Sequence, residues 1–424
     1  MSAVSYARQL LLAIAERLDW KALNACTPRA RCWNGQRLVL MAWLMAWQPG
    51  GSLGRRFDQA RRVLRQMLPK QRLGRSYTGY ADALAAASPA LLEALTGQLQ
   101  GPLEPALAGW RALAADGTRC AVPRSAANEQ AFPRSGRQRS GPQLGLLAVR
   151  NQANGRLWAF RVAPAICNER TLLRRLLPLL PPGALLVLDA GFSGYELLEQ
   201  MRACGLHFLA RVGAGTRLLE GLRLVRQRKG IVYLWPQWAA QLSLPPLVLR
   251  QIVLRPGNGA TPLYLLTDVL DGRALPAWVA GRLYRGRWGV EVDFRTLKQV
   301  LGFEHLQSRQ PRRAECELSW AVASLWLLQA LGQPPEAHAR PSPAGRLACV
   351  RQAISQCWWR RPPQTLGRAL RRARRDDYRR HSAKVRRPWP RKKRKPPPRP
   401  PKLAMATERQ VAQAKALAQG PHPP

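Results

Sequence analysis

Apolar residues recur every three or four positions along the N-terminal part of the chain. The segments ARQLLLAIAERL, RLVLMAWLMAW and LLEALTGQL show this spacing, and breakers such as Pro49-Gly50-Gly51 lie between them. Such spacing places apolar side chains on one face of a helix, whereas Pro and Gly interrupt helices. Residues 1–106 are therefore predicted to form an N-terminal helical region.

The pattern changes to short strands from Trp110 onward. LGLLAVRN and GRLWAFRVAP are joined by Asn154-Gly155, a pair that is typical of a hairpin turn. The run ALLVLD, which ends at Asp189, is apolar up to its last residue, as in a strand that is buried on both faces. FLARV is predicted to be another strand, and an apolar helix is predicted from Glu169 to Leu180.

The second half of the chain contains three further kinds of segment. Residues 213–264 include strand-like pieces such as GIVYLWP and PLVLRQIVLR, which predict a β-rich insertion. Helical spacing returns in residues 278–301 and 314–331. After Arg360 the chain is dense in Arg, Lys and Pro. Such a tail has little apolar surface to bury and repels itself, so it is predicted to be largely disordered.

The composition indicates a polyanionic partner. The chain has 424 residues, of which 46% are hydrophobic, and this is enough to bury a large core. Its 68 Lys and Arg residues against 24 Asp and Glu give a formal net charge of +44, which favours nucleic acid as the partner. A GC-rich coding sequence can also raise the Arg count, but it does not explain the scarcity of acidic residues.

Several classes of protein are disfavoured. No apolar run approaches the ~20 residues that a membrane-spanning helix needs, so no membrane partner is expected. Glu16 and Asp19 interrupt the apolar N-terminal segment, which is unlike a secretory signal. The eight cysteines form no CxxC pair, so neither a zinc site nor a disulfide framework is expected. A cytoplasmic protein fits these features.

Two carboxylates stand at the predicted ends of apolar strands. Asp116 closes RALAAD and precedes Gly117, and Asp189 closes ALLVLD and precedes Ala190-Gly191. A strand would hold each carboxylate rigidly while the glycine lets the backbone turn away, and such oxygen ligands suit divalent metal ions. Alternatively, either aspartate accepts hydrogen bonds within its own turn or caps the following helix.

A third group of polar residues lies on one predicted helix. At 3.6 residues per turn, one face of the helix in GRLYRGRWGVEVDFRTLKQVL carries Tyr284, Arg287, Glu291 and Lys298. A separate apolar stripe is formed by Val290, Phe294, Leu297 and Leu301. The helix can therefore pack while it presents a polar edge. A solvated charged face beside a core stripe is the alternative interpretation, and Trp288 is predicted to pack the helix.

These residues together resemble a known family. The spacing Tyr-x2-Arg-x3-Glu-x6-Lys is similar to the YREK signature of the insertion-sequence-four type DDE transposases. Asp116-Gly117-Thr118 resembles the first aspartate motif of that family, and Leu188-Asp189-Ala190-Gly191-Phe192 followed by FLAR resembles the second. Many members have Arg where Ala190 stands, a departure that concerns local contacts rather than metal binding.

The resemblance implies an α/β fold with a ribonuclease-H-like mixed sheet flanked by helices. The catalytic domain would span residues 107–335, interrupted by the β-rich insertion at 213–264. A helical extension at 336–359 and the basic tail at 360–424 would follow. Asp116, Asp189 and Glu291 would then converge as catalytic residues and bind two Mg²⁺ or Mn²⁺ ions, an arrangement that suits phosphoryl transfer.

The resemblance also implies DNA contacts. Tyr284, Arg287 and Lys298 would touch phosphates near the cleaved end, where a base is flipped out of the duplex. Trp235 and Trp238 in the insertion could stack on that base, although a tryptophan among strands is more often a core residue. The tail could follow DNA phosphates or be a solvated extension.

The resulting functional hypothesis is a bacterial, nucleoid-associated cut-and-paste transposase. It would bind the terminal inverted repeats of its element and join them to target DNA, as a homodimer or larger complex on the DNA ends. Two alternatives stay open: a metal-dependent nuclease of the same fold, and an inactive DNA-binding relic.

Overall fold

A computed structural model describes residues 6–28, 32–133, 141–226, 230–255, 261–331, 342–355, 365–373 and 399–419. The chain divides into two compact units. The first unit comprises Met1–Glu104, Asp116–Leu172 and Gly289–Asp376. The second unit comprises Pro105–Ala115, Leu173–Trp288 and Asp377–Pro424.

Helices make up most of the first unit, as the N-terminal pattern predicts. Those with most of their residues in this unit are α1 (Tyr6–Ala15), α2 (Trp20–Ala25), α3 (Gly35–Trp47), α4 (Leu53–Met67), α5 (Tyr77–Gln100), α6 (Ala126–Ala131), α7 (Glu169–Arg174), α11 (Trp288–Arg295), α12 (Pro311–Ala330), α13 (Pro343–Ser355) and α14 (Leu366–Arg372). The side chains of Asn34, Ser52 and Ser76 accept backbone N–H groups at the starts of α3, α4 and α5. Each cap satisfies a donor that a helix start otherwise leaves unpaired.

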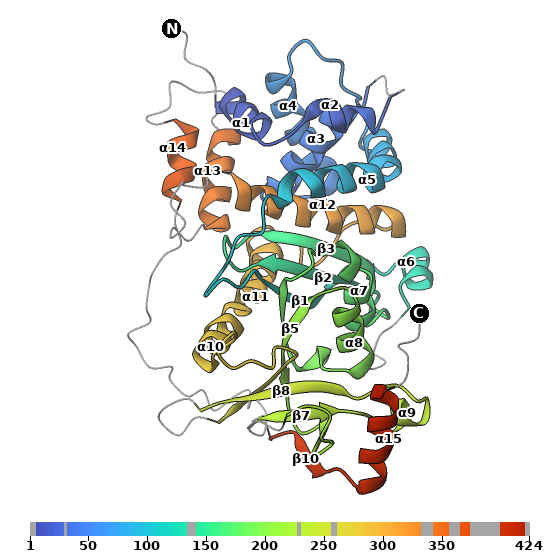
Figure 1. The fold of residues 1–424 in the computed structure, drawn as a ribbon. Coiled ribbons are helices and arrows are strands. Elements are labelled where there is room, and N and C mark those ends of the chain that lie inside the picture. The colour runs from blue at the N-terminus through green and yellow to red at the C-terminus, as the bar shows by residue number, and fades with distance from the viewer. Residues whose placement is uncertain are drawn as a thin grey trace, which may run out of the picture. The chain divides into compact units, whose positions relative to one another are not determined.

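Two apolar helices form the core of the first unit. Helix α3 is buried along most of its length, with Leu40, Trp43 and Trp47 each 0% exposed. Helix α12 is similarly buried around Trp326 and packs against α3, α5 and α13 (Figure 1). A helix that is apolar on every side belongs in an interior, and burying a side chain such as Leu40 contributes about 1.5–3 kcal/mol.

A β-hairpin accompanies these helices in the first unit. Strand β1 (Ala112–Ala121) begins in the second unit and ends in the first, where the strand order is β1-β2-β3. Strands β2 (Gln143–Asn151) and β3 (Leu157–Pro164) pair antiparallel, with a register shift between Val149 and Arg150. Gly155 turns with a φ of +72°, so the predicted hairpin turn is confirmed.

The second unit is built on a mixed sheet. Its order is β10-β6-β7-β8-β9-β5-β4-β1. The strands after β1 are β4 (Leu185–Leu188), β5 (His207–Val212), β6 (Arg217–Glu220), β7 (Ile231–Leu234), β8 (Leu247–Leu254), β9 (Leu263–Thr267) and β10 (Lys402–Met405). Strands β1, β4 and β5 run parallel to one another. The pairs β5–β9, β9–β8, β8–β7 and β7–β6 are antiparallel. The predicted mixed sheet is confirmed, and these directions agree with a ribonuclease-H-like fold.

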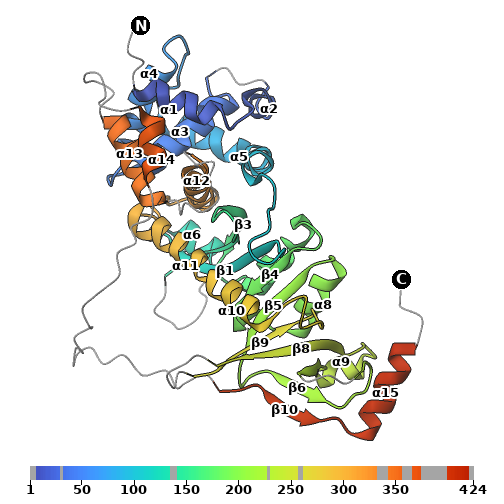
Figure 2. The same ribbon diagram turned by 60° about the vertical axis from the view of Figure 1, so that its left-hand side comes forward.

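Helices cover the sheet of the second unit. They are α8 (Tyr195–Ala203), α9 (Gln237–Gln241), α10 (Ala277–Gly286) and α15 (Glu408–Gln419), with short 3₁₀ turns at Leu177–Leu179 and Ala190–Phe192. Figure 2 shows α10 beside the sheet, where Val279, Ala280 and Leu283 join the buried cluster around Leu185. The residues predicted as a β-rich insertion form β6, β7, β8, the start of β9, and α9.

The C-terminal segment differs from the predicted disordered tail. Strand β10 pairs parallel with β6, from Lys402 beside Arg217 to Met405 beside Glu220. Helix α15 follows, with Val411 and Ala414 buried. These backbone pairs and apolar side chains order residues 399–419 in spite of the basic composition around them. The Arg- and Pro-dense residues 374–398 lie outside the described part of the chain. No helix among the described residues is long and apolar enough to cross a membrane.

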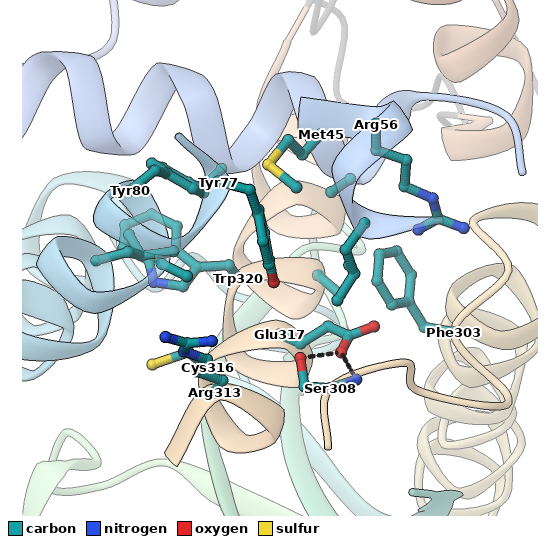
Figure 3. Close-up of a pocket in the computed structure, with 16 residues that line it drawn as sticks. Met45, Arg56, Tyr77, Tyr80, Phe303, Ser308, Arg313, Cys316, Glu317 and Trp320 are labelled. Carbon is teal, nitrogen blue, oxygen red and sulfur yellow. Dashed lines mark hydrogen bonds between the residues drawn. The ribbon is translucent and has the colours of Figure 1, made fainter. Parts of the chain in front are cut away.

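A pocket of about 60 Å³ in the first unit is lined by the half-buried carboxylate of Glu317 (Figure 3). Glu317 accepts the backbone N–H groups of Gln307 and Ser308 at 3.0 and 2.9 Å, and the Ser308 hydroxyl at 2.7 Å. Through these three hydrogen bonds, Glu317 fastens the loop before α12 to that helix. In the same pocket, the Arg56 guanidinium lies 5.5 Å from the ring centroid of Phe303.

We expect Glu317→Ala to lower the free energy of unfolding by about 1–3 kcal/mol, because two backbone donors lose their acceptor. Glu317→Gln keeps one acceptor oxygen and should lose less. Glu93→Ala, on the exposed face of α5, is the matched control and should leave stability nearly unchanged. Urea denaturation of the three variants checks this order, and equal midpoints for the Glu317 variants and wild type would contradict it.

Candidate catalytic site

Asp189 stands directly after a fully buried strand. Every residue of β4 is buried, as its apolar run predicts, and the chain then turns through Ala190–Phe192. The Asp189 side chain makes no helix-capping hydrogen bond. Instead, its carboxylate accepts the Tyr284 hydroxyl at 3.2 Å and lies 3.7 Å from an Arg211 guanidinium nitrogen. The carboxylate is therefore held by other elements, not by its own turn.

Tyr284 and Arg287 stand together at the end of α10. The Arg287 guanidinium lies 5.7 Å from the Tyr284 ring centroid, and Arg287 is only 7% exposed. Burial and the negative charge of Asp189 raise the pKa of Tyr284 to about 12. The phenol therefore stays protonated at neutral pH, so it can donate to the carboxylate.

Arg211 is a residue of this cluster that sequence reasoning missed. Strands β4 and β5 are parallel neighbours, with Leu188 beside Ala210. The next residue on each strand, Asp189 and Arg211, therefore emerges at the same sheet edge. The signal was present in the sequence, because each apolar run carries a charged residue at or near its carboxyl end, and the carboxyl ends of parallel strands share an edge.

Asp116 lies within β1 and not at its end. The strand continues to Ala121, so the predicted turn after Gly117 is wrong. A Cβ at Gly117 would overlap the Glu169 carboxyl group. The glycine therefore leaves room for a close side chain and does not form a turn. Asp116 is half-buried, and one of its oxygens accepts the Gly117 N–H at 2.9 Å.

Glu291 and Lys298 lie on two different kinds of helix. Glu291 is on α11, whereas Lys298 is in a π-helical stretch, Thr296–Val300. The Leu301 N–H donates to the Thr296 carbonyl at 3.0 Å, the wider spacing of a π-turn. The sequence predicts one regular α-helix with all four signature residues on the same face. For Lys298 this prediction is wrong, because the helix changes to π-type before it. The apolar stripe is confirmed, because all four of its members are buried.

Lys298 is close enough to the strand that carries Asp116 to act on it electrostatically. Burial raises the pKa of the Cys120 thiol to about 11, and the positive charge of Lys298 opposes that rise. Cys120 is the fourth residue after Asp116 on β1. The first unit therefore brings the basic end of the signature close to the first aspartate strand.

The predicted catalytic residues, and three of the residues predicted to bind DNA, fall into both units. Asp189, Tyr284 and Arg287 belong to the second unit, and Asp116, Glu291 and Lys298 to the first. Within the described residues, no three His, Cys, Asp or Glu side chains lie close enough together to hold a metal ion. The convergence of the three carboxylates stays a prediction. Their chemistry fits Mg²⁺ or Mn²⁺, since both prefer oxygen ligands.

The three tryptophans considered in the sequence differ in exposure. Trp235 is 6% exposed, and its ring N–H donates to the Leu244 carbonyl at 2.8 Å. Its ring is therefore a core group, which corrects its proposed role as a stacking surface. Trp238 is 38% exposed and meets Tyr195 edge-on with ring centroids 5.5 Å apart. Trp288 is 59% exposed, so its predicted packing role is wrong.

Comparison with known proteins identifies the family of the chain. A family model described as a transposase DDE domain matches residues 109–327. The chain belongs to this family. The resemblance to DDE transposases inferred from the aspartate motifs is therefore confirmed.

Individual relatives are more distant. The chain is 25% identical over 233 residues to "Transposase InsG for insertion sequence element IS4" of Escherichia coli (strain K12), a match that covers 50% of each chain. It is 26% identical over 161 residues to "Putative transposase y4zB" of Sinorhizobium fredii (strain NBRC 101917 / NGR234), covering 35% of this chain and 42% of the relative. The chain thus spans about half the length of these curated relatives.

A solved structure is also similar. It is a piggyBac transposase synaptic complex with hairpin DNA, with a TM-score of 0.42 and 12% sequence identity. The match covers 88% of this chain and 86% of that chain.

We expect opposite shifts in the pKa of Tyr284 when its charged neighbours are neutralised. Asp189→Asn removes a negative charge and should lower the pKa, whereas Arg211→Gln removes a positive charge and should raise it. The measurement is the NMR titration of ¹³C-labelled tyrosine at an alkaline pH where the phenol is partly ionised, with Tyr284→Phe to assign the signal. The same ionised fraction in both variants and wild type would contradict this cluster.

Proposed function

We propose that the protein is a DNA transposase that cleaves the ends of a mobile element and joins them to target DNA. The observation that carries the proposal is the contact of the Tyr284 hydroxyl with Asp189 at 3.2 Å. This contact joins the second aspartate motif to the first residue of the four-residue signature. The membership of residues 109–327 in the transposase DDE family supports the same function.

The proposed chemistry is phosphoryl transfer. Asp116, Asp189 and Glu291 would hold two Mg²⁺ or Mn²⁺ ions, which supply activation of a water or 3′-hydroxyl and neutralise charge on the leaving oxygen. Tyr284 keeps its proton at neutral pH and orients the Asp189 carboxylate. Arg287 and Lys298 would bind DNA phosphates, contacts that position the DNA backbone and carry little sequence information.

The N-terminal helical region offers a surface for the DNA ends. Burial lowers the pKa of Arg61, and the nearby positive charges of Arg65 and Arg75 lower it further. Helix α4 also carries Arg62 beside Arg61 and Arg65, and so basic a helix favours a polyanion as its partner. We propose that this surface contacts the terminal inverted repeats, and that a dimer or larger complex brings two ends together.

Two other functions are possible for a chain with these residues. A metal-dependent nuclease would cleave without joining, and an inactive relic would bind DNA by charge alone. Incubation with Mg²⁺, DNA carrying the element's ends and a target plasmid separates them. Joined products support the transposase, cleavage without joining supports the nuclease, and binding without cleavage supports the relic.

We expect Asp116→Asn, Asp189→Asn and Glu291→Gln each to abolish cleavage and strand transfer while DNA affinity stays close to that of the wild type. Each change removes an anionic ligand without changing the shape of the side chain. The control is Asp82→Asn, which removes an exposed ion pair with Arg313 at 2.6 Å and should leave cleavage unchanged. Gel assays of cleavage and binding check this, and substantial cleavage by any of the three variants would contradict the metal assignment.

A second prediction concerns base stacking by Trp238. Trp238→Ala should weaken binding to DNA ends with an unpaired base by about 1–3 kcal/mol, the size of one base–aromatic stack. Affinity for a fully paired duplex should change less. Trp235→Phe keeps a buried ring and is the matched control, with normal affinity for both DNAs. Fluorescence anisotropy measures the affinity of the wild type and both variants for each DNA, and equal losses on both DNAs for Trp238→Ala would argue against stacking.

A further inference from the structure

A buried polar network lies two residues beyond Glu291, in the first unit. Asp293 is 4% exposed, and its carboxylate lies 2.9 Å from the Arg150 Nε atom. The contact is an ion pair without the alignment of a hydrogen bond. The other carboxylate oxygen accepts the Gln329 side-chain amide at 2.9 Å. The network thus ties α11, which carries Glu291, to β2 and α12.

The backbone is shaped to let Arg150 reach Asp293. Arg150 stands at the register shift between β2 and β3, and such a bulge redirects a side chain out of the normal alternation of a strand. Two glycines make room for its guanidinium. A Cβ at Gly289 would overlap it, and a Cβ at Gly155 would lie 2.7 Å from its Nη2 atom. Larger residues at either position would displace the arginine.

Gln329 closes the network into a ring. Its side-chain oxygen accepts the backbone N–H of Leu157 at 2.8 Å, while its nitrogen donates to Asp293. Leu157 is the partner of Arg150 across the hairpin. The hairpin, α11 and α12 are therefore joined through one carboxylate, and Gln329 is itself 0% exposed. Each of the three side chains has a defined partner, so none can rotate without breaking a contact.

A network of this kind serves geometry more than stability. Burying a charged pair costs nearly as much desolvation as the pair regains, so an apolar replacement is often neutral or stabilising. What the pair adds is a fixed orientation, since its contacts are directional. Outer partners that fix the orientation of metal ligands are a common device in metal sites.

We infer that Asp293, Arg150 and Gln329 are positioning residues, which hold the turn of α11 that carries Glu291 in the orientation required for metal binding. The inference rests on the proposed function, because it takes Glu291 as a metal ligand. Asp293 itself is not assigned as a ligand, since its oxygens face Arg150 and Gln329.

The test compares the full-length wild type with Asp293→Asn, Arg150→Lys and Asp82→Asn. Asp293→Asn keeps an oxygen for Gln329 but removes the charge opposite Arg150. Arg150→Lys keeps the charge but not the planar group between the two glycines. Asp82→Asn removes an exposed ion pair in the same unit. The measurements are Mn²⁺ affinity of the DNA-free protein by electron paramagnetic resonance, the Mg²⁺ concentration for half-maximal cleavage, DNA affinity and thermal unfolding.

For Asp293→Asn, the expected result is an Mn²⁺ affinity about 10-fold or more below that of the wild type, with a parallel rise in the Mg²⁺ requirement and DNA affinity unchanged. Arg150→Lys should give a smaller shift in the same direction, and it replaces Asp293→Asn if that variant does not fold. Asp82→Asn should match the wild type.

Two results would overturn the inference in distinguishable ways. If the wild type binds Mn²⁺ and cleaves DNA but both network variants keep its metal affinity and merely unfold at lower temperature, the network is structural only. If the wild type neither binds Mn²⁺ nor cleaves DNA, the proposed function fails, and the inference fails with it.

Discussion

An exposed sheet edge must hold a carboxylate still if that carboxylate is to bind anything with fixed geometry. Asp189 meets this requirement through contacts that come from outside its own turn. Strand β4 delivers it, the neighbouring parallel strand supplies Arg211 at 3.7 Å, and α10 supplies the Tyr284 hydroxyl at 3.2 Å. The phenol is kept neutral by burial and by the carboxylate itself. These contacts fix the orientation of the Asp189 carboxylate. The ion pair with Arg211 offsets little of its charge, because an ion pair at a half-exposed position is weak.

Two carboxylates in the first unit are likewise held by donors from other segments of the chain. There Asp293 and Glu317 are both surrounded by donors, the first by Arg150 and Gln329 and the second by the backbone and hydroxyl of the loop before α12. Buried acids in so basic a chain need such partners, since an unpaired one would be protonated or would destabilise the fold. Asp293 fastens α11, which carries Glu291, and Glu317 fastens the loop before α12 to that helix.

Much of the fold could be predicted from the sequence, because apolar spacing is a local property. The buried strand before Asp189, the hairpin at Asn154-Gly155 and the apolar stripe of α11 all follow from such spacing. Errors arose where a distant residue decides the outcome. Glu169 explains Gly117, and pairing with β6 orders the segment after residue 399. The π-turn around Lys298 is also invisible to a count of 3.6 residues per turn. In the candidate site, Asp189 and Tyr284 were both proposed from the sequence, and the structure joins them by a hydrogen bond. The contact of Arg211 with Asp189 could not be predicted without knowing that β4 and β5 are neighbours.

The pairing of β10 with β6 has a consequence for biosynthesis. The segment that covers β6 is made last, since residues 217–220 leave the ribosome long before residues 402–405. Until then β6 is the edge strand of the second unit, and β10 takes that place once it has paired. Nascent chains, and copies shortened by a frameshift or a premature stop codon, would therefore expose β6 where the longer chain exposes β10, and an exposed edge can pair with other strands.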